Sequence, residues 1–148
     1  MPVFEYRTPL KASPQQVFDF ILSPANLQAI APPESNFVYV DPPQLIVLGT
    51  HLLCKIQAYG MVQQMKYEIV EMDPPNRYRE NLVEGALKKW QHDYIVDAGH
   101  EGAAVLTNRI EFEPPGGMMG LIVTADRIME ALEDGFYHRS LALKKVFG

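Results

Sequence analysis

The sequence predicts an α+β fold, in which a curved antiparallel sheet of six to seven strands packs around one long C-terminal helix, with two short helices after the first strand. Three observations predict it. Residues 118–147 repeat apolar side chains at steps of three and four, which is typical of one face of a helix. Several earlier segments alternate apolar and polar residues, as strands do. Four Pro-Pro pairs separate elements, because proline lacks a backbone donor and ends regular structure.

The first third of the chain is expected to form a strand and two short helices. Residues 3–10 alternate loosely between apolar and polar side chains and predict the first strand. The sequence Ser13-Pro14-Gln15-Gln16 is typical of a helix start, because Ser caps a helix, Pro suits its first position and Gln its third. This helix should end near Leu22. Ser23-Pro24 then predicts a second helix, which the Pro32-Pro33 pair ends.

The middle of the chain is expected to form the rest of the sheet. Each further segment predicted as a strand is bounded by turn-forming residues, and these segments are residues 36–41, 44–48, 50–59, 62–72, 77–83, 88–98 and 103–112. Segment 44–48 is either a separate short strand or a continuation of the one before it. Tyr59-Gly60-Met61 predicts a hairpin turn. An antiparallel sheet of this kind has one apolar face, and that face needs a cover.

The C-terminal segment, residues 118–147, is long enough to provide the cover. About thirty residues at ~1.5 Å each give a helix of ~45 Å. The side chains of its apolar stripe that should pack on the sheet are Ile122, Ala125, Met129, Leu132 and Phe136. Gly135 is a candidate bend inside the helix. Arg139 and Ser140 fall where the next apolar residue is due and leave a gap in the stripe.

Composition narrows the class of protein. A chain of 148 residues is expected to form one domain, residues 1–148. A net charge of −5 disfavours nucleic acid as a partner. No signal peptide is expected from the first residues, and no membrane span is expected because no apolar run approaches ~18 residues. One cysteine, Cys54, excludes an internal disulfide and fits a reducing compartment, so the cytoplasm is the expected setting. The oligomeric state stays open.

Short motifs along the whole chain resemble those of one superfamily. They are Ala12–Phe18, Pro24–Leu27, Trp90–Tyr94, Leu106–Phe112 and Phe136–Arg139. On these residues the chain resembles the START-like (SRPBCC) helix-grip superfamily, which includes birch-pollen-allergen relatives, lipid-transfer domains and bacterial polyketide cyclase/dehydrase-like proteins. It looks most similar to the small single-domain bacterial members. One departure is Asn108, which stands where many similar bacterial chains carry Asp.

The resemblance, together with the alternation of the strands, predicts a ligand site. A curved sheet around a helix leaves a hollow, and such hollows hold apolar ligands. The residues expected to line it are Ile56, Met65, Tyr67, Trp90, His92, Tyr94, Asn108, Phe112, Met129, Leu132 and Phe136. No cofactor is expected. One cysteine and four scattered histidines have no metal-ligand spacing, so no metal site is predicted.

Three functions remain open at this stage. The favoured one is a carrier or sensor of a small to medium hydrophobic ligand. The second is a polyketide cyclase/dehydratase-like enzyme using His92 or Tyr94 as acid or base, which is disfavoured because no orienting acid for His92 is visible. The third is a protein-interaction module with a vestigial cavity. A hollow of ~300–1,000 Å³ would support binding, whereas a filled interior would support the third.

Arg139 also has two interpretations. It either binds a carboxylate or phosphate head group inside the hollow, since a guanidinium suits such anions, or it forms a salt bridge on the surface or at the sheet edge.

Overall fold

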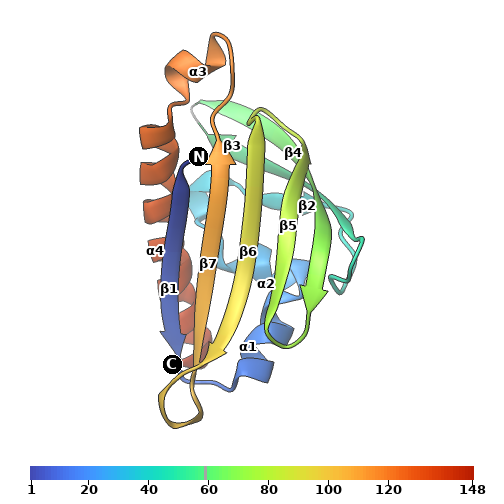
Figure 1. Ribbon diagram of the computed structural model, residues 1–148, viewed down its shortest axis with the longest axis vertical. Helices are drawn as coiled ribbons and strands as arrows, with labels where there is room; N and C mark the ends of the chain where they lie inside the picture. Colours follow the sequence, from blue (N-terminus) through green and yellow to red (C-terminus); the bar gives the residue numbers. More distant parts are fainter. Residues whose placement is uncertain (59) are drawn as a thin grey trace.

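The computed structural model describes residues 1–58 and 60–148 (Figure 1). Its elements in chain order are β1 (Val3–Leu10), α1 (Pro14–Ile21), α2 (Pro24–Ile30), η1 (Pro33–Ser35), β2 (Val38–Val40), β3 (His51–Ala58), β4 (Met61–Asp73), β5 (Arg77–Glu84), β6 (Lys89–Ala98), η2 (His100–Gly102), β7 (Ala104–Glu113), α3 (Met119–Ile122) and α4 (Ala125–Phe147).

The strands form one antiparallel sheet in the order β1-β7-β6-β5-β4-β3-β2. Strands β2 to β7 follow one another as a meander, and β1 joins beside β7. The sheet curls, and α4 runs along β1 while α1 and α2 close one end of the curl (Figure 1). The predicted fold class, a curved antiparallel sheet gripping a C-terminal helix, is therefore confirmed.

Both short helices begin as predicted. In α1 the backbone N–H of Gln16 donates to Ser13 Oγ at 3.2 Å, and the backbone N–H of Ser13 donates to Gln16 Oε1 at 2.9 Å. This reciprocal pair satisfies two amides that would otherwise lack a partner at the helix start. In α2 the N–H of Asn26 donates to Ser23 Oγ at 3.3 Å. Tyr78 of β5 donates its hydroxyl to the carbonyl of Ile21 at 2.6 Å and so fixes α1 to the sheet.

The predicted strand at residues 44–48 is wrong. The chain there forms bends and a turn, and the N–H of Ile46 donates to the carbonyl of Leu22 at 2.8 Å instead of to a strand. Ile46 is buried, while Leu45, Val47 and Leu48 are exposed. The physical cause lies just before it, because Pro42 and Pro43 lack donors and cannot continue a ladder.

The preceding strand is also shorter than predicted. Residues 36–41 were expected to be extended, but β2 covers only Val38–Val40. Asn36 and Asp41, which flank it, have positive φ angles of 49° and 46°. This left-handed conformation turns the chain, and asparagine and aspartate tolerate it better than most side chains.

The C-terminal helix is interrupted, which the periodicity did not predict. Val123 and Thr124 separate α3 from α4, and Thr124 caps α4 by accepting from the N–H of Arg127 at 3.3 Å. Ile122, which was expected to pack on the sheet, is 52% exposed, and Val123 is buried in its place. At 23 residues, α4 is ~35 Å long. Its helical span runs through Gly135 without a break.

The hairpins follow the predicted pattern where they are described. Strands β3 and β4 pair up to Ala58 opposite Met61, and Gly60 has a φ of +74°, which suits a tight turn. Tyr59, part of the predicted turn, lies outside the described residues. On β6 the side chains of His92, Tyr94 and Val96 are buried, as the alternation predicts.

Candidate ligand-binding site

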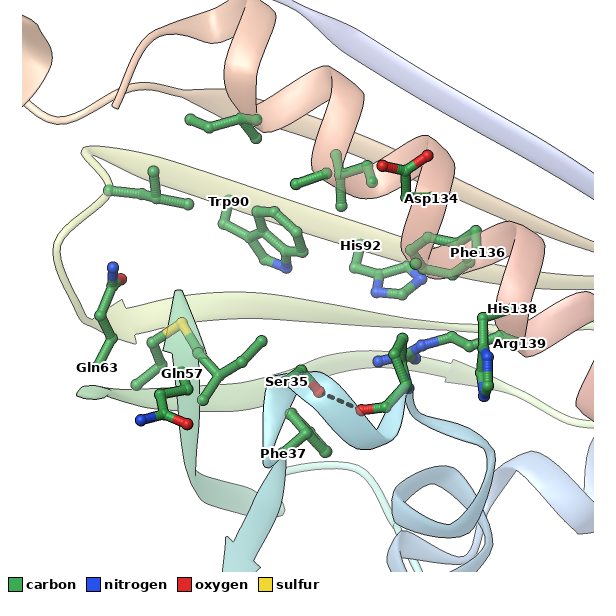
Figure 2. Close-up of a pocket in the computed structure, with 18 of the residues that line it drawn as sticks. Ser35, Phe37, Gln57, Gln63, Trp90, His92, Asp134, Phe136, His138 and Arg139 are labelled. Carbon is green, nitrogen blue, oxygen red and sulfur yellow. Dashed lines mark hydrogen bonds between the residues drawn. The ribbon is translucent and has the colours of Figure 1, made fainter. Parts of the chain in front are cut away.

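A cavity of about 550 Å³ lies between the sheet and α4. Strands β3, β4, β5 and β6 supply its walls, α4 covers it, and η1 with the start of β2 lies at its other side. Figure 2 shows Trp90 and His92 on the wall that faces Gln57 and Gln63, with Phe136 and Arg139 reaching in from α4. The interior is therefore open rather than filled by side chains.

Most of the predicted ligand-binding residues meet around this cavity. Eight of the eleven line it, namely Ile56, Met65, Tyr67, Trp90, His92, Tyr94, Leu132 and Phe136. They come together because side chains on a strand alternate, so residues two apart on β3, β4 and β6 share the inward face.

Asn108, Phe112 and Met129 lie beside the cavity instead of lining it. Phe112 is fully buried in a cluster with Ile110 and Phe4, and Met129 packs against that cluster. These residues belong to β7 and to the side of α4 nearest β1, where helix and sheet are in contact and side chains fill the gap. Asn108 is buried behind His92.

Three aromatic rings form a continuous stack on the inward face of β5 and β6. The rings of Tyr78 and Tyr94 lie 4.4 Å apart at 21°, and those of Tyr94 and His92 lie 3.8 Å apart at 18°. Trp90 meets His92 edge-on at 6.4 Å. Stacked aromatic pairs contribute to stability beyond the area that they bury. His92 is thereby fixed in orientation from one side.

Asn108 fixes His92 from another side. Nε2 of His92 lies 2.9 Å from Asn108 Oδ1, which makes Nε2 the donor and leaves Nδ1 as the acceptor. Burial lowers the pKa of His92 from 6.5 to about 3, against a smaller opposing effect of the Asn108 hydrogen bond, and the positive charge of Arg139 lowers it further. His92 is therefore a neutral imidazole at neutral pH.

Glu80 is the cavity residue that sequence reasoning missed. It lines the cavity from β5, is 5% exposed, and places Oε2 3.8 Å from Nδ1 of His92. Since His92 is neutral, this contact is not an ion pair at neutral pH. Burial raises the pKa of Glu80 from 4.5 to about 7, and Arg139 opposes that rise. The carboxyl is thus poised between its two protonation states.

A signal for Glu80 was present in the sequence. Tyr78, Glu80 and Leu82 are two residues apart and share one face of β5, while Arg77 and Arg79 share the other. An acid on the apolar face of a strand is unusual and is a candidate functional residue. It also places a carboxyl 3.8 Å from Nδ1 of His92, an acidic neighbour that the sequence did not predict.

Arg139 lies in the cavity wall, which favours the first of its two interpretations. Its Cζ is 5.0 Å from the centre of the Phe136 ring and 5.8 Å from that of Phe37. Among the described residues, no carboxylate oxygen lies within 4.0 Å of its guanidinium. The expected surface or sheet-edge salt bridge is therefore not seen.

The described residues contain no group of three or more His, Cys, Asp or Glu side chains placed to hold a metal ion. Among the described helices, none combines the length and apolar character that crossing a bilayer requires.

Solved structures with this architecture come from several sources. A START superfamily protein from Mycobacterium smegmatis superposes with a TM-score of 0.74 at 10% identity, covering 98% of this chain and 96% of that one. Protein CV1439 from Chromobacterium violaceum gives 0.73 at 18% identity, with 99% and 98% covered. Ara h 8.0201, a Bet v 1-like protein, gives 0.69 at 14% identity, with 98% and 96% covered. Identities this low establish the fold alone.

No curated protein sequence matches the chain significantly. A family model does match, over residues 1–143, and its description is polyketide cyclase / dehydrase and lipid transport. Family and fold together suggest a hydrophobic ligand-binding or polyketide cyclase-like function. With the match covering nearly the whole chain, the protein belongs to the polyketide cyclase / dehydrase and lipid transport family.

Proposed function

We propose that the protein binds a small to medium hydrophobic ligand in the cavity between sheet and α4, as a carrier or sensor. The observation that carries this proposal is the cavity of about 550 Å³, since ligand pockets are typically ~300–1,000 Å³ and mostly apolar with a few polar groups. A protein interior is normally packed as densely as an organic crystal, so a hollow of this size is unlike a vestigial site. We place the protein in the cytoplasm, where its buried Cys54 thiol would stay reduced.

Trp90 offers a direct readout of occupancy. It lines the cavity and is the only tryptophan in the chain. Its indole Nε1–H is buried without a hydrogen-bond partner among the described residues. A buried donor without a partner costs roughly 1–3 kcal/mol, so a ligand with an acceptor near this position would relieve that cost.

The test compares a blocked cavity with an intact one. Leu132→Trp enlarges a lining residue of α4, while Leu141→Trp adds the same bulk at an exposed position of the same helix. Dodecan-1-ol and flavone serve as neutral probes, and isothermal titration calorimetry measures their affinity. We expect micromolar binding, or ~8 kcal/mol, to the parent and to Leu141→Trp, and at least tenfold weaker binding to Leu132→Trp. If the parent binds none of a broad panel of apolar compounds, the interaction-module alternative replaces the ligand-binding function.

A second candidate is a cyclase- or dehydratase-type enzyme, and one observation favours it. Glu80, His92 and Asn108 form a chain of polar groups at the cavity wall, and the pKa of Glu80 is raised to about 7. An acid–base catalyst works best with a pKa near the operating pH. His92, with a pKa lowered to about 3, is a weak base, so Glu80 is the better proton acceptor.

Turnover of poly-β-ketone thioesters, followed as loss of water by mass spectrometry, tests the enzyme candidate. A fall of ~10²-fold in Glu80→Gln, with folding retained, would support catalysis at this carboxyl. If the parent forms no product from any of the poly-β-ketone thioesters, the enzyme candidate is rejected and the carrier or sensor function remains.

A further inference from the structure

Arg139 presents an uncompensated positive charge to the cavity. It lies in α4 at the gap of the apolar stripe, and Figure 2 shows its side chain extending from the helix into the space between His92 and Phe37. The Phe136 and Phe37 rings lie near its guanidinium carbon at 5.0 and 5.8 Å. Cation–π contacts of this kind hold a guanidinium without using the N–H donors at its edge.

The protein itself does not neutralise this charge by contact. No described carboxylate reaches within 4.0 Å of Arg139. Glu80 is the buried acid of the same cavity, and its own burial favours the neutral form. Glu34 and Asp134 also line the cavity, but both are exposed to water, where screening weakens their attraction.

The rest of the cavity differs in character. Val123, Ile128 and Leu132 line it from α4 and its preceding turn, and Trp90 and Met65 line it from the sheet. Ile128 precedes Arg139 by eleven residues, which is ~16 Å along a helix axis. One site therefore combines a cationic group with an apolar surface extending more than two helical turns away from it.

We propose that the ligand is an amphipathic monocarboxylic acid, whose carboxylate pairs with Arg139 while its apolar part lies against Trp90, Leu132 and Ile128. This rests on the ligand-binding function proposed above. A guanidinium and a carboxylate share planar, two-point hydrogen-bond geometry. A single negative charge fits because Arg139 is the one arginine or lysine among the described residues that line the cavity.

The experiment compares ligands that differ only in the head group. Dodecanoic acid, dodecan-1-ol and dodecyl phosphate are titrated calorimetrically below their aggregation concentrations, into the parent, Arg139→Met and Arg127→Met. Arg127 is the matched control, because it is an exposed arginine of the same helix that does not line the cavity. We expect the parent to bind the acid at least tenfold tighter than the alcohol. Arg139→Met should lose that preference while binding the alcohol within threefold of the parent, and Arg127→Met should keep it.

Other outcomes of the titrations would contradict the head-group assignment, the choice of a carboxylate, or ligand binding itself. Equal affinity of the parent for acid and alcohol, or an acid preference that survives in Arg139→Met, overturns the head-group assignment but leaves ligand binding standing. If dodecyl phosphate binds tenfold tighter than dodecanoic acid, the assignment of a carboxylate as the head group is overturned. Binding of none of the three overturns the underlying function. If Arg139→Met fails to fold by circular dichroism, Arg139→Gln replaces it, and the comparison within the parent still decides.

Discussion

Glu80 is the residue whose chemistry most distinguishes the cavity from an ordinary core. Its carboxyl is buried. The charged group that acts on it is Arg139 from α4, and the neutral imidazole of His92 from β6 lies 3.8 Å away. The tyrosines around it (Tyr39, Tyr67, Tyr78 and Tyr94) have pKa values raised by burial and remain neutral near pH 7. Near pH 7 the titration of Glu80 is therefore not overlapped by that of the buried His92 and tyrosines around it.

Glu80→Gln should change the pH dependence of stability. The pKa of Glu80 is about 7 in the folded protein against a usual value of 4.5, so the folded state binds the extra proton between these values. Stability from this group is fully present below pH 4.5 and lost as pH rises through 7, a loss of roughly 3 kcal/mol. The free energy of unfolding, measured with urea at pH 4.5 and at pH 8, should therefore increase in Glu80→Gln relative to the parent as the pH rises. A constant difference between the two proteins at both pH values would contradict the assignment.

His92 should respond to a charge placed at its hydrogen-bond partner. Asn108→Asp puts a carboxylate 2.9 Å from Nε2, and a nearby negative charge favours the protonated imidazole. The pKa of His92, about 3 in the parent, should rise by at least one unit, as followed by NMR of its ring protons. Its folded pKa lies below 6.5, so His92 contributes stability above pH 6.5 that is lost as pH falls towards 3. An unchanged His92 titration in the variant would show that Asn108 does not govern it.

At the scale of elements, the break between α3 and α4 decides how the C-terminal helix meets the sheet. Val123 is buried and lines the cavity, whereas Met118, Leu121 and Ile122 are exposed. Thr124 starts a new helix whose side chains from Ile128 onwards cover the cavity. Because of the break, Val123 is the buried residue at this point, and not Ile122, which the periodicity of a continuous helix predicts.

Thr124→Ala should destabilise the protein by about 1 kcal/mol, because it removes the side-chain acceptor for the N–H of Arg127. Thr124→Ser keeps the acceptor and is the control. Thermal unfolding followed by circular dichroism measures both. Equal melting temperatures for the Ala and Ser variants would mean that the cap does not stabilise α4.

At the scale of the whole molecule, the protein keeps a space of about 550 Å³ inside a fold of 148 residues. Side chains around a cavity lose the contacts that a packed core would give them. Occupancy by a ligand restores such contacts only in the folded state, so a ligand should stabilise the fold.

Dodecan-1-ol at one hundred times its dissociation constant should stabilise the protein by about 2.7 kcal/mol. For a domain of this size that is a rise of roughly 5–11 °C in melting temperature. Differential scanning calorimetry of the parent with and without the alcohol measures it, and Leu132→Trp, with its cavity blocked, should show a much smaller rise. A shift of equal size in both proteins would locate binding elsewhere.

Local patterns in the sequence determined the inward faces. Trp90, His92 and Tyr94 share a side of β6, and Met65 and Tyr67 share one of β4, because side chains on a strand alternate with a period of two. The helix start at Ser13 was readable because a cap depends on neighbours three residues apart. Such interactions need no knowledge of the rest of the fold.

Tertiary structure decided where space remains between those faces. Phe112 and Trp90 are both aromatic residues on alternating strands in the sequence. In the structure Phe112 is fully buried in a cluster with Ile128 and Phe136 of α4, whereas Trp90 packs at the edge of that cluster and lines the cavity. The pKa of Glu80 and the position of Arg139 depend likewise on groups that the chain brings together over long separations. Periodicity assigns a side chain to a face, but only the packed fold determines what stands opposite it.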